Sequence, residues 1–145
     1  SVCIPETVTY IGNSAFQDCK NLGSVTFLGA PATITVGNNA FQDCVKLKSI
    51  NLPAAKTIGN FAFEGCISLE NLVLDYGTES IGEYCFNGCS SLKVIEIPNS
   101  VTYIGNGVFG GERKGVLTVR CIEGSEADNV AQRYSSETLV IEYVY

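Results

Sequence analysis

The chain has 145 residues, which is long enough for one domain with its own hydrophobic core. Its formal net charge is -6 and its 9 lysine and arginine residues are scattered, so it lacks the basic patch of proteins that bind nucleic acid or anionic membranes. The absence of histidine removes the commonest general base and a common metal ligand, and apolar residues never form the run of ~20 that spans a membrane.

Residues 1–10 are predicted to be the second half of a repeating unit. The opening segment "SVCIPETVTYIG" matches "VIEIPNSVTYIG" at residues 94–105. Alternating apolar residues predict a short strand centred near residue 3, with Val2 and Ile4 facing the core and Cys3 facing solvent. We therefore expect the chain to be the C-terminal part of a longer repeat array. It contains no segment with the charged-then-apolar pattern of a signal peptide.

Five repeats follow, with starts that lie 25, 22, 23 and 23 residues apart. Each repeat opens with isoleucine or valine followed by glycine and has phenylalanine five residues after its start; the first four also have cysteine eight and leucine eleven residues after it. The starts are Ile11, Val36, Ile58, Ile81 and Ile104. A period of this length is typical of a solenoid, in which one repeat cannot bury its apolar face alone and neighbouring repeats stack to bury it.

Each of the first four repeats ends in two apolar residues separated by one other residue, which predicts one short parallel strand per repeat. We expect strands centred near residues 3, 26, 51, 73, 96 and 118. The predicted fold is a leucine-rich-repeat type of solenoid: a right-handed superhelix with one parallel β-sheet on its concave side and short 3-10 or turn segments on its convex side. The glycine after each start is expected to provide a positive φ or a close backbone approach at a corner.

The end of the chain is predicted to cap the solenoid. The fifth repeat lacks both the cysteine and the leucine, as terminal repeats often do. Residues 124–134 predict a short helix, because Ser125 suits an N-cap and apolar residues recur on one face. Residues 138–145 predict a strand. We expect one domain over residues 1–145, with residues 122–145 as its C-terminal cap.

The chain has 7 cysteines, and their spacing argues against a metal site or a catalytic thiol. There is no C-x-x-C pair, no histidine to complete a zinc site and no evident base for a nucleophilic cysteine. The cysteines at the shared repeat position are expected to be buried, unpaired packing residues, as is Cys85, which occupies an alanine position. They are Cys19, Cys44, Cys66 and Cys89. Cys3 is expected to be the most exposed and reactive cysteine.

The shared pattern, I-G-x-x-A-F-x-x-C-x-x-L-x-x-V-x-I-P, resembles the BspA-type leucine-rich repeat over about residues 2–121. It is visible in "IGNFAFEGCISLENLVL" and in "IGEYCFNGCSSLKVIEIP". The resemblance implies an adhesion module of a cell-surface or secreted protein. We expect the chain to be non-catalytic, because no catalytic constellation is evident, to hold no cofactor or metal, and to be a monomer. Its expected partner is a host extracellular-matrix or cell-surface protein, or a glycan. A structural spacer that presents another domain of its parent protein is the alternative.

The candidate binding residues face outward from the predicted strands, because the inward positions are committed to packing and the outward ones differ between repeats. They are Ser24, Thr26, Ser49, Asn51, Asn71, Val73, Val94, Glu96, Val116 and Thr118. Such small, mostly uncharged residues suit a broad protein or glycan surface; a solvated sheet face without a partner is the alternative. A second candidate is the longer segment at residues 28–35, since binding loops often lie in such insertions; a neutral length variant is the alternative.

Overall fold

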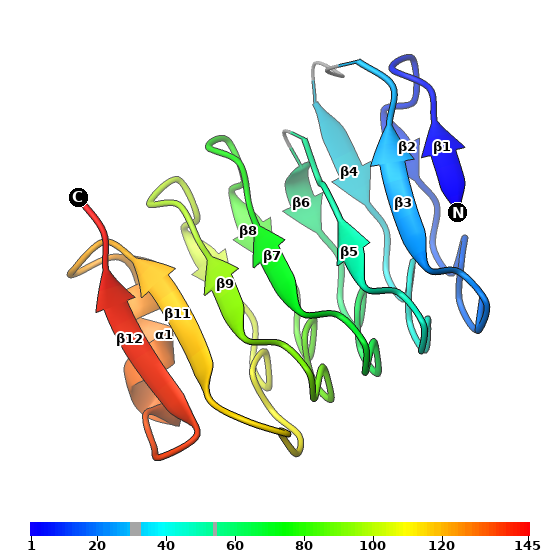
Figure 1. Ribbon diagram of the computed structural model, residues 1–145. Coiled ribbons are helices and arrows are strands. Elements are labelled where there is room, and N and C mark those ends of the chain that lie inside the picture. Colours follow the sequence, from blue (N-terminus) through cyan, green and yellow to red (C-terminus); the bar gives the residue numbers. More distant parts are fainter. Residues whose placement is uncertain (30–32, 54) are drawn as a thin grey trace.

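The computed structural model describes residues 1–29, 33–53 and 55–145 of the chain. These residues form a parallel-strand solenoid with one row of parallel strands along its whole length, a second sheet behind this row and tight turns that connect the two on one side (Figure 1). A helix and a final strand lie at the C-terminal end (Figure 1). The solenoid predicted from the repeat pattern is therefore confirmed.

The sheet in front, which we call the strand sheet, has one strand from each repeat and one from the cap. Its members are β1 (Val2–Ile4), β3 (Ser24–Phe27), β5 (Ser49–Ile50), β7 (Asn71–Val73), β9 (Val94–Glu96), β11 (Leu117–Cys121) and β12 (Leu139–Tyr143). Neighbouring strands pair in parallel, and between β5 and β7 the pairing narrows to a bridge that joins Leu52 to Leu74. These strands lie where the alternation of apolar residues predicts them.

A second parallel sheet, which the repeat pattern did not predict, lies behind the strand sheet (Figure 1). Its members are β2 (Tyr10–Ile11), β4 (Ile34–Val36), β6 (Ala55–Ile58), β8 (Ser80–Ile81) and β10 (Tyr103–Ile104). Each strand contains the isoleucine or valine that starts a repeat. Segments this short do not show a clear alternation of apolar and polar residues, so only their stacking on neighbouring repeats reveals them as strands.

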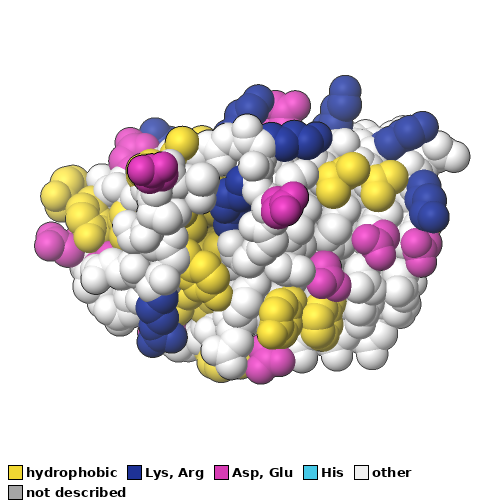
Figure 2. Space-filling view, turned by 90° about the horizontal axis from the view of Figure 1, so that it is seen from below, with side chains coloured by type: hydrophobic (Ala, Val, Ile, Leu, Met, Phe, Trp, Pro, Cys, Tyr) yellow, Lys and Arg dark blue, Asp and Glu magenta, His cyan; other side chains and the backbone are white. Residues whose placement is uncertain are grey.

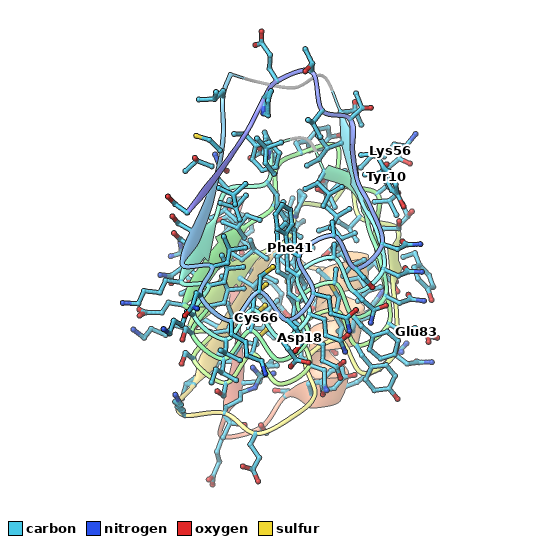
Figure 3. The ribbon with its side chains drawn as sticks, turned by 90° about the vertical axis from the view of Figure 1, so that its right-hand side faces the viewer. Tyr10, Asp18, Phe41, Lys56, Cys66 and Glu83 are labelled. Carbon is cyan, nitrogen blue, oxygen red and sulfur yellow. The ribbon has the colours of Figure 1, made fainter. Side chains whose placement is uncertain are left out.

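The core lies between the two sheets and is built around a stack of phenylalanine rings, one from each of the first four repeats. Figure 3, seen from the N-terminal end of the solenoid, places Phe41 between the sheets. Ring centroids are 5.2 Å apart from Phe16 to Phe41, 5.2 Å from Phe41 to Phe63 and 5.8 Å from Phe63 to Phe86. The last three rings are fully buried, whereas Phe16, at the open end of the stack, is half-buried.

Glycine is required at the corner after each internal strand of the second sheet, because an asparagine from the preceding repeat packs against it. A Cβ atom on Gly59 would lie 2.6 Å from the backbone nitrogen of Asn38, closer than real contacts allow. The asparagine side chains also link the repeats: Oδ1 of Asn38 accepts a hydrogen bond from the backbone N–H of Asn60 at 2.9 Å. The glycine is therefore needed because the backbones of two repeats approach each other closely, and not because of a positive φ angle. The positive φ angles lie two residues later, for example 58° at Phe61.

The C-terminal cap has the predicted helix and strand. Helix α1 (Glu126–Tyr134) begins after Ser125, whose side chain accepts a hydrogen bond from the backbone N–H of Asp128 at 3.2 Å. The helix packs against β10, β11 and β12, and β12 extends the strand sheet by pairing with β11. The buried apolar residues of the helix are Ala127, Val130 and Ala131.

Asp128 joins the helix to the last strand. Its carboxylate accepts hydrogen bonds from the backbone N–H of Gly124 at 2.8 Å, the side chain of Gln132 at 2.9 Å and the hydroxyl of Tyr143 at 3.1 Å. These bonds, led by the one from Gly124, stabilise the ionised form and lower the pKa of the carboxyl below its ordinary value. Asp128 therefore stabilises the cap above its ordinary pKa, and this contribution is lost as the pH falls through the lowered value.

We expect Asp128→Asn to reduce the acid sensitivity of the protein. The wild-type protein should lose stability below about pH 4, in part because Asp128 takes up a proton, and the variant has no carboxyl to protonate at this site. Urea unfolding at about pH 6 and about pH 3 measures the difference, with Glu137→Gln as a control at an exposed carboxyl. An equal loss of stability in Asp128→Asn and wild type would contradict this assignment.

Candidate functional site

Nine of the ten outward positions predicted from the sequence lie along the outer face of the strand sheet, and the tenth, Val116, precedes β11. Between them, inward residues such as Val25, Leu72 and Ile95 are buried in the core. Six of the ten are exposed: Thr26, Ser49, Asn51, Asn71, Val73 and Val116. Four are half-buried: Ser24, Val94, Glu96 and Thr118. The face is therefore accessible along the solenoid, and its binding of a partner stays a prediction.

The register of β11 corrects the alignment of the fifth repeat. Thr118 pairs with Val94, and Arg120 pairs with Glu96. The repeat pattern had placed Val116 and Thr118 in these two rows, which is wrong by two residues. Val94 lies eight residues after Phe86, whereas its partner Thr118 lies nine residues after Phe109, so the fifth repeat is one residue longer at this point. The predicted positions Val116 and Thr118 correspond to a repeat one residue shorter, which makes the total error two residues. Arg120 thus belongs to the outer face, and the alternation of apolar residues within β11 is the signal that identifies it.

The C-terminal part of the outer face combines exposed apolar residues with a row of charges. We call it the strand-face patch; it consists of Val73, Val94, Glu96, Arg120, Val140 and Glu142. Val73 is 53% exposed and Val140 is 43% exposed. Arg120 donates two hydrogen bonds to the carboxylate of Glu142, at 2.9 and 3.1 Å, and these bonds lower the pKa of Glu142. The pair is solvent-exposed, so it contributes little to stability and is available to a partner.

The strand face offers a broad contact surface. Among residues 1–29, 33–53 and 55–145, no group of three or more side chains of the metal-binding types could hold a metal ion. Within the same ranges, no helix has the length and apolar character needed to cross a membrane. The geometry supports noncovalent contact spread over several strands, which lie about 4.8 Å apart in a sheet.

The second candidate, the segment at residues 28–35, lies partly outside the described residues, because these do not include residues 30–32. At its start Leu28 is 56% exposed, and β4 begins near its end at Ile34. A binding role for this segment stays a prediction.

The repeated cysteines pack inward and also donate hydrogen bonds, a role that the repeat pattern does not reveal. The thiol of Cys44 donates to the carbonyl oxygen of Phe16 at 3.0 Å, and Cys66 and Cys89 bond to the phenylalanine of the preceding repeat in the same way at 3.1 Å. These three thiols are buried and free, as predicted. Cys19 is free but only half-buried, which corrects its predicted burial, because it lies at the open end of the stack.

We expect thiol reagents to modify Cys3 first in the native protein. Cys3 is exposed, whereas burial raises the pKa of Cys44 to about 11 and that of Cys89 to about 12, so these thiols stay protonated and shielded near neutral pH. Mass spectrometry after treatment with iodoacetamide should show one fast site, which the Cys3→Ser variant lacks. Rapid labelling of Cys44 in the folded protein would contradict the assignment.

Comparisons with known proteins find the same repeat. The model of the BspA type leucine rich repeat region matches residues 1–114, with 6 copies. The crystal structure of a T. pallidum leucine-rich repeat protein, TpLRR, is similar with a TM-score of 0.72 and 33% sequence identity, over 78% of this chain and 52% of that chain. A search of curated proteins found no match.

Two further crystal structures share the fold along nearly the whole chain. The pneumococcal vaccine antigen PcpA has a TM-score of 0.69 and 19% identity, over 98% of this chain and 42% of that chain. A leucine-rich repeat protein from Bacteroides ovatus ATCC 8483 has a TM-score of 0.65 and 24% identity, over 99% of this chain and 42% of that chain. The chain thus spans about half the length of TpLRR and 42% of the length of each of the other two proteins.

Proposed function

Because the chain belongs to the BspA-type leucine-rich repeat family, we propose that it is a non-catalytic protein-binding module of a cell-surface or secreted protein. Solenoid proteins form extended binding surfaces from the side chains that their cores do not use. The proposed surface is the outer face of the strand sheet. Contact centres on the strand-face patch and extends over Asn51 and Thr26 toward the N-terminal end.

The proposal rests on the difference in burial and in variation between the inward and outward residues of the strands. Inward residues are apolar and buried in successive repeats, whereas outward residues change from Thr26 and Asn51 to Val73 and Glu96. The side chain of Val73 is more than half exposed, so it contributes little to the core. Apolar residues beside charged ones suit a protein interface, in which apolar contact supplies affinity and charges supply specificity.

The proposed partner is a protein of the extracellular matrix or of another cell's surface. A location at the cell surface or outside the cell is supported by the similarity of the fold to a pneumococcal vaccine antigen, because antibodies must be able to reach such an antigen. The mostly uncharged N-terminal half of the face, with Ser24, Thr26 and Ser49, supports contacts that depend only modestly on salt.

Adhesion of the purified chain to immobilised extracellular-matrix proteins and to epithelial cells tests the proposal. Asn51→Arg and Val73→Arg should each weaken adhesion while circular dichroism and unfolding stay unchanged. Tyr103→Arg is the control, since it places the same charge at an exposed position of the second sheet. Undiminished adhesion of both strand-face variants would contradict the proposal. Failure of the unmutated chain to adhere would favour the alternative, a structural spacer that presents another domain of the parent protein.

A further inference from the structure

A pocket opens at the edge of the strand sheet, beside the N-terminal ends of β9 and β11. It has a volume of about 230 Å³, and its lining includes Glu70, Ser90, Ser91, Lys93, Lys114 and Gly115. This volume is below the roughly 300–1,000 Å³ of pockets for drug-sized ligands. The pocket is therefore suited to a single side chain of a partner.

The pocket exists because the fifth repeat interrupts the series of stacked leucines. Leu92 is the last of these leucines and is 2% exposed. Counting from the start of the fifth repeat gives Gly115 as the equivalent residue, and counting back from the register of β9 and β11 gives Val116. A Cβ atom added at Gly115 would meet no atom within 4 Å. The next residue, Val116, does not fill the space, because its side chain is 48% exposed.

Lysine side chains give this region a positive charge. The backbone N–H of Lys93 donates to the carbonyl oxygen of Glu70, and that of Glu70 donates to Lys48, so these three residues lie side by side on successive repeats. The Glu70 carboxylate pairs with the ammonium group of Lys93 at 2.7 Å. Lys114 forms no ion pair with any residue in the described part of the chain. Three lysines and one glutamate leave two positive charges here, whereas the whole chain has a net charge of -6.

We infer that this pocket binds a carboxylate side chain from an acidic segment of the partner protein, an inference that rests on the proposed protein-binding function. The ammonium groups of Lys93 and Lys114 are donors for the carboxylate oxygens, and charge-assisted hydrogen bonds of this kind are strong. The hydroxyl groups of Ser90 and Ser91 add donors that carry no charge. Val116 offers apolar contact to the methylene groups of a glutamate.

A carboxylate on a protein segment fits this pocket better than a long sulfated polysaccharide does. Figure 2, which views the molecule from the side of the tight turns, shows several Lys and Arg side chains along the upper edge and a few elsewhere, with Asp and Glu side chains both among them and over the rest of the face. A long polyanion would extend beyond the pocket and approach other acidic residues to within the Debye length of about 8–10 Å, where they repel it. A short acidic segment can instead place one carboxylate in the pocket and continue over Val94 onto the strand-face patch.

Fluorescence anisotropy of a labelled peptide of alternating glutamate and valine, titrated with the whole chain, tests the inference. A peptide of alternating glutamine and valine is the matched ligand, and we expect only the glutamate peptide to bind. Raising NaCl from about 20 to about 300 mM should weaken binding, because exposed charges are screened. Lys114→Gln should weaken it by about threefold, the size of one exposed ion pair. Gly115→Leu should also weaken it, because the added side chain occupies the pocket.

Lys56→Gln is the control variant, since Lys56 is an exposed lysine of β6 that pairs with Glu79 at 3.6 Å, and it should leave binding unchanged. Three results would overturn the inference. The first is equal binding of both peptides, and the second is unchanged binding of the glutamate peptide by Lys114→Gln and Gly115→Leu. The third is stronger binding of heparin than of the glutamate peptide. Asn51→Arg separates the inference from the proposed function. Asn51 lies outside the strand-face patch and follows β5, two strands away from β9, so this variant should lose adhesion to the partner and keep its affinity for the peptide within about twofold. Adhesion that does not depend on Asn51, together with peptide binding that does depend on Lys114, would contradict the proposed function and still support the pocket.

Discussion

Replacing Phe63 by alanine should lower the free energy of unfolding by about 3–5 kcal/mol. The ring of Phe63 is fully buried and lies between those of Phe41, at 5.2 Å, and Phe86, at 5.8 Å. The substitution removes these contacts and leaves a cavity, which the hydrogen-bonded sheets on both sides prevent from collapsing. Because each repeat contacts only its neighbours, the lesion should also uncouple the unfolding of the two halves of the solenoid.

Urea unfolding followed by circular dichroism measures the loss, and a broader or two-step transition would report the uncoupling. Phe16→Ala is the matched control, because Phe16 is half-buried at the open end of the stack. Its substitution should cost clearly less than that of Phe63. A loss below about 1 kcal/mol for Phe63→Ala would show that the phenylalanine stack does not form the core.

Replacing Gly59 by alanine should destabilise the protein by about 3 kcal/mol, at the upper end of the range for overpacking. The added methyl group would lie 2.6 Å from the backbone nitrogen of Asn38 and 2.6 Å from the carbonyl carbon of Gly37. Both contacts are with backbone atoms, which cannot move aside as a flexible side chain can. The two repeats would have to separate at this corner, and the hydrogen bond from the N–H of Asn60 to the side chain of Asn38 would lengthen or break.

Gly12→Ala is the control for this effect, because Gly12 occupies the same position in the first repeat. A Cβ atom there would come no closer than 3.9 Å to a neighbouring atom, the Cε1 of Tyr10. Since Gly12 does not have a positive φ, its replacement should change stability by less than about 1 kcal/mol. Thermal unfolding of both variants compares them directly. Equal effects of the two substitutions would rule out close packing against Asn38 as the reason for glycine at this corner.

The amino-acid sequence alone was sufficient to predict the repeat, the strand sheet and the cap, because their causes lie in residues close together in the chain. Phe63 and Leu69 recur at the same spacing in neighbouring repeats, and residues that cannot be buried within one repeat must be buried between repeats. Alternation around Ile95 places its neighbours on the outer face. The helix N-cap at Ser125 depends on a residue only three positions away, so it too was predictable.

Other features were decided only by the tertiary structure, because they depend on which residue of one repeat lies beside which residue of the next. The second sheet, the close approach at Gly59 and the hydrogen bond of the Cys66 thiol all join consecutive repeats. The pairing of Arg120 with Glu96 and the pocket at Gly115 both arise in the fifth repeat, where one additional residue shifts the strand relative to the repeat start. Counting residues along the chain gives the position of a residue within its own repeat. Which residues of two repeats lie side by side is set by backbone pairing, and in an irregular repeat this pairing differs from the one that the count predicts.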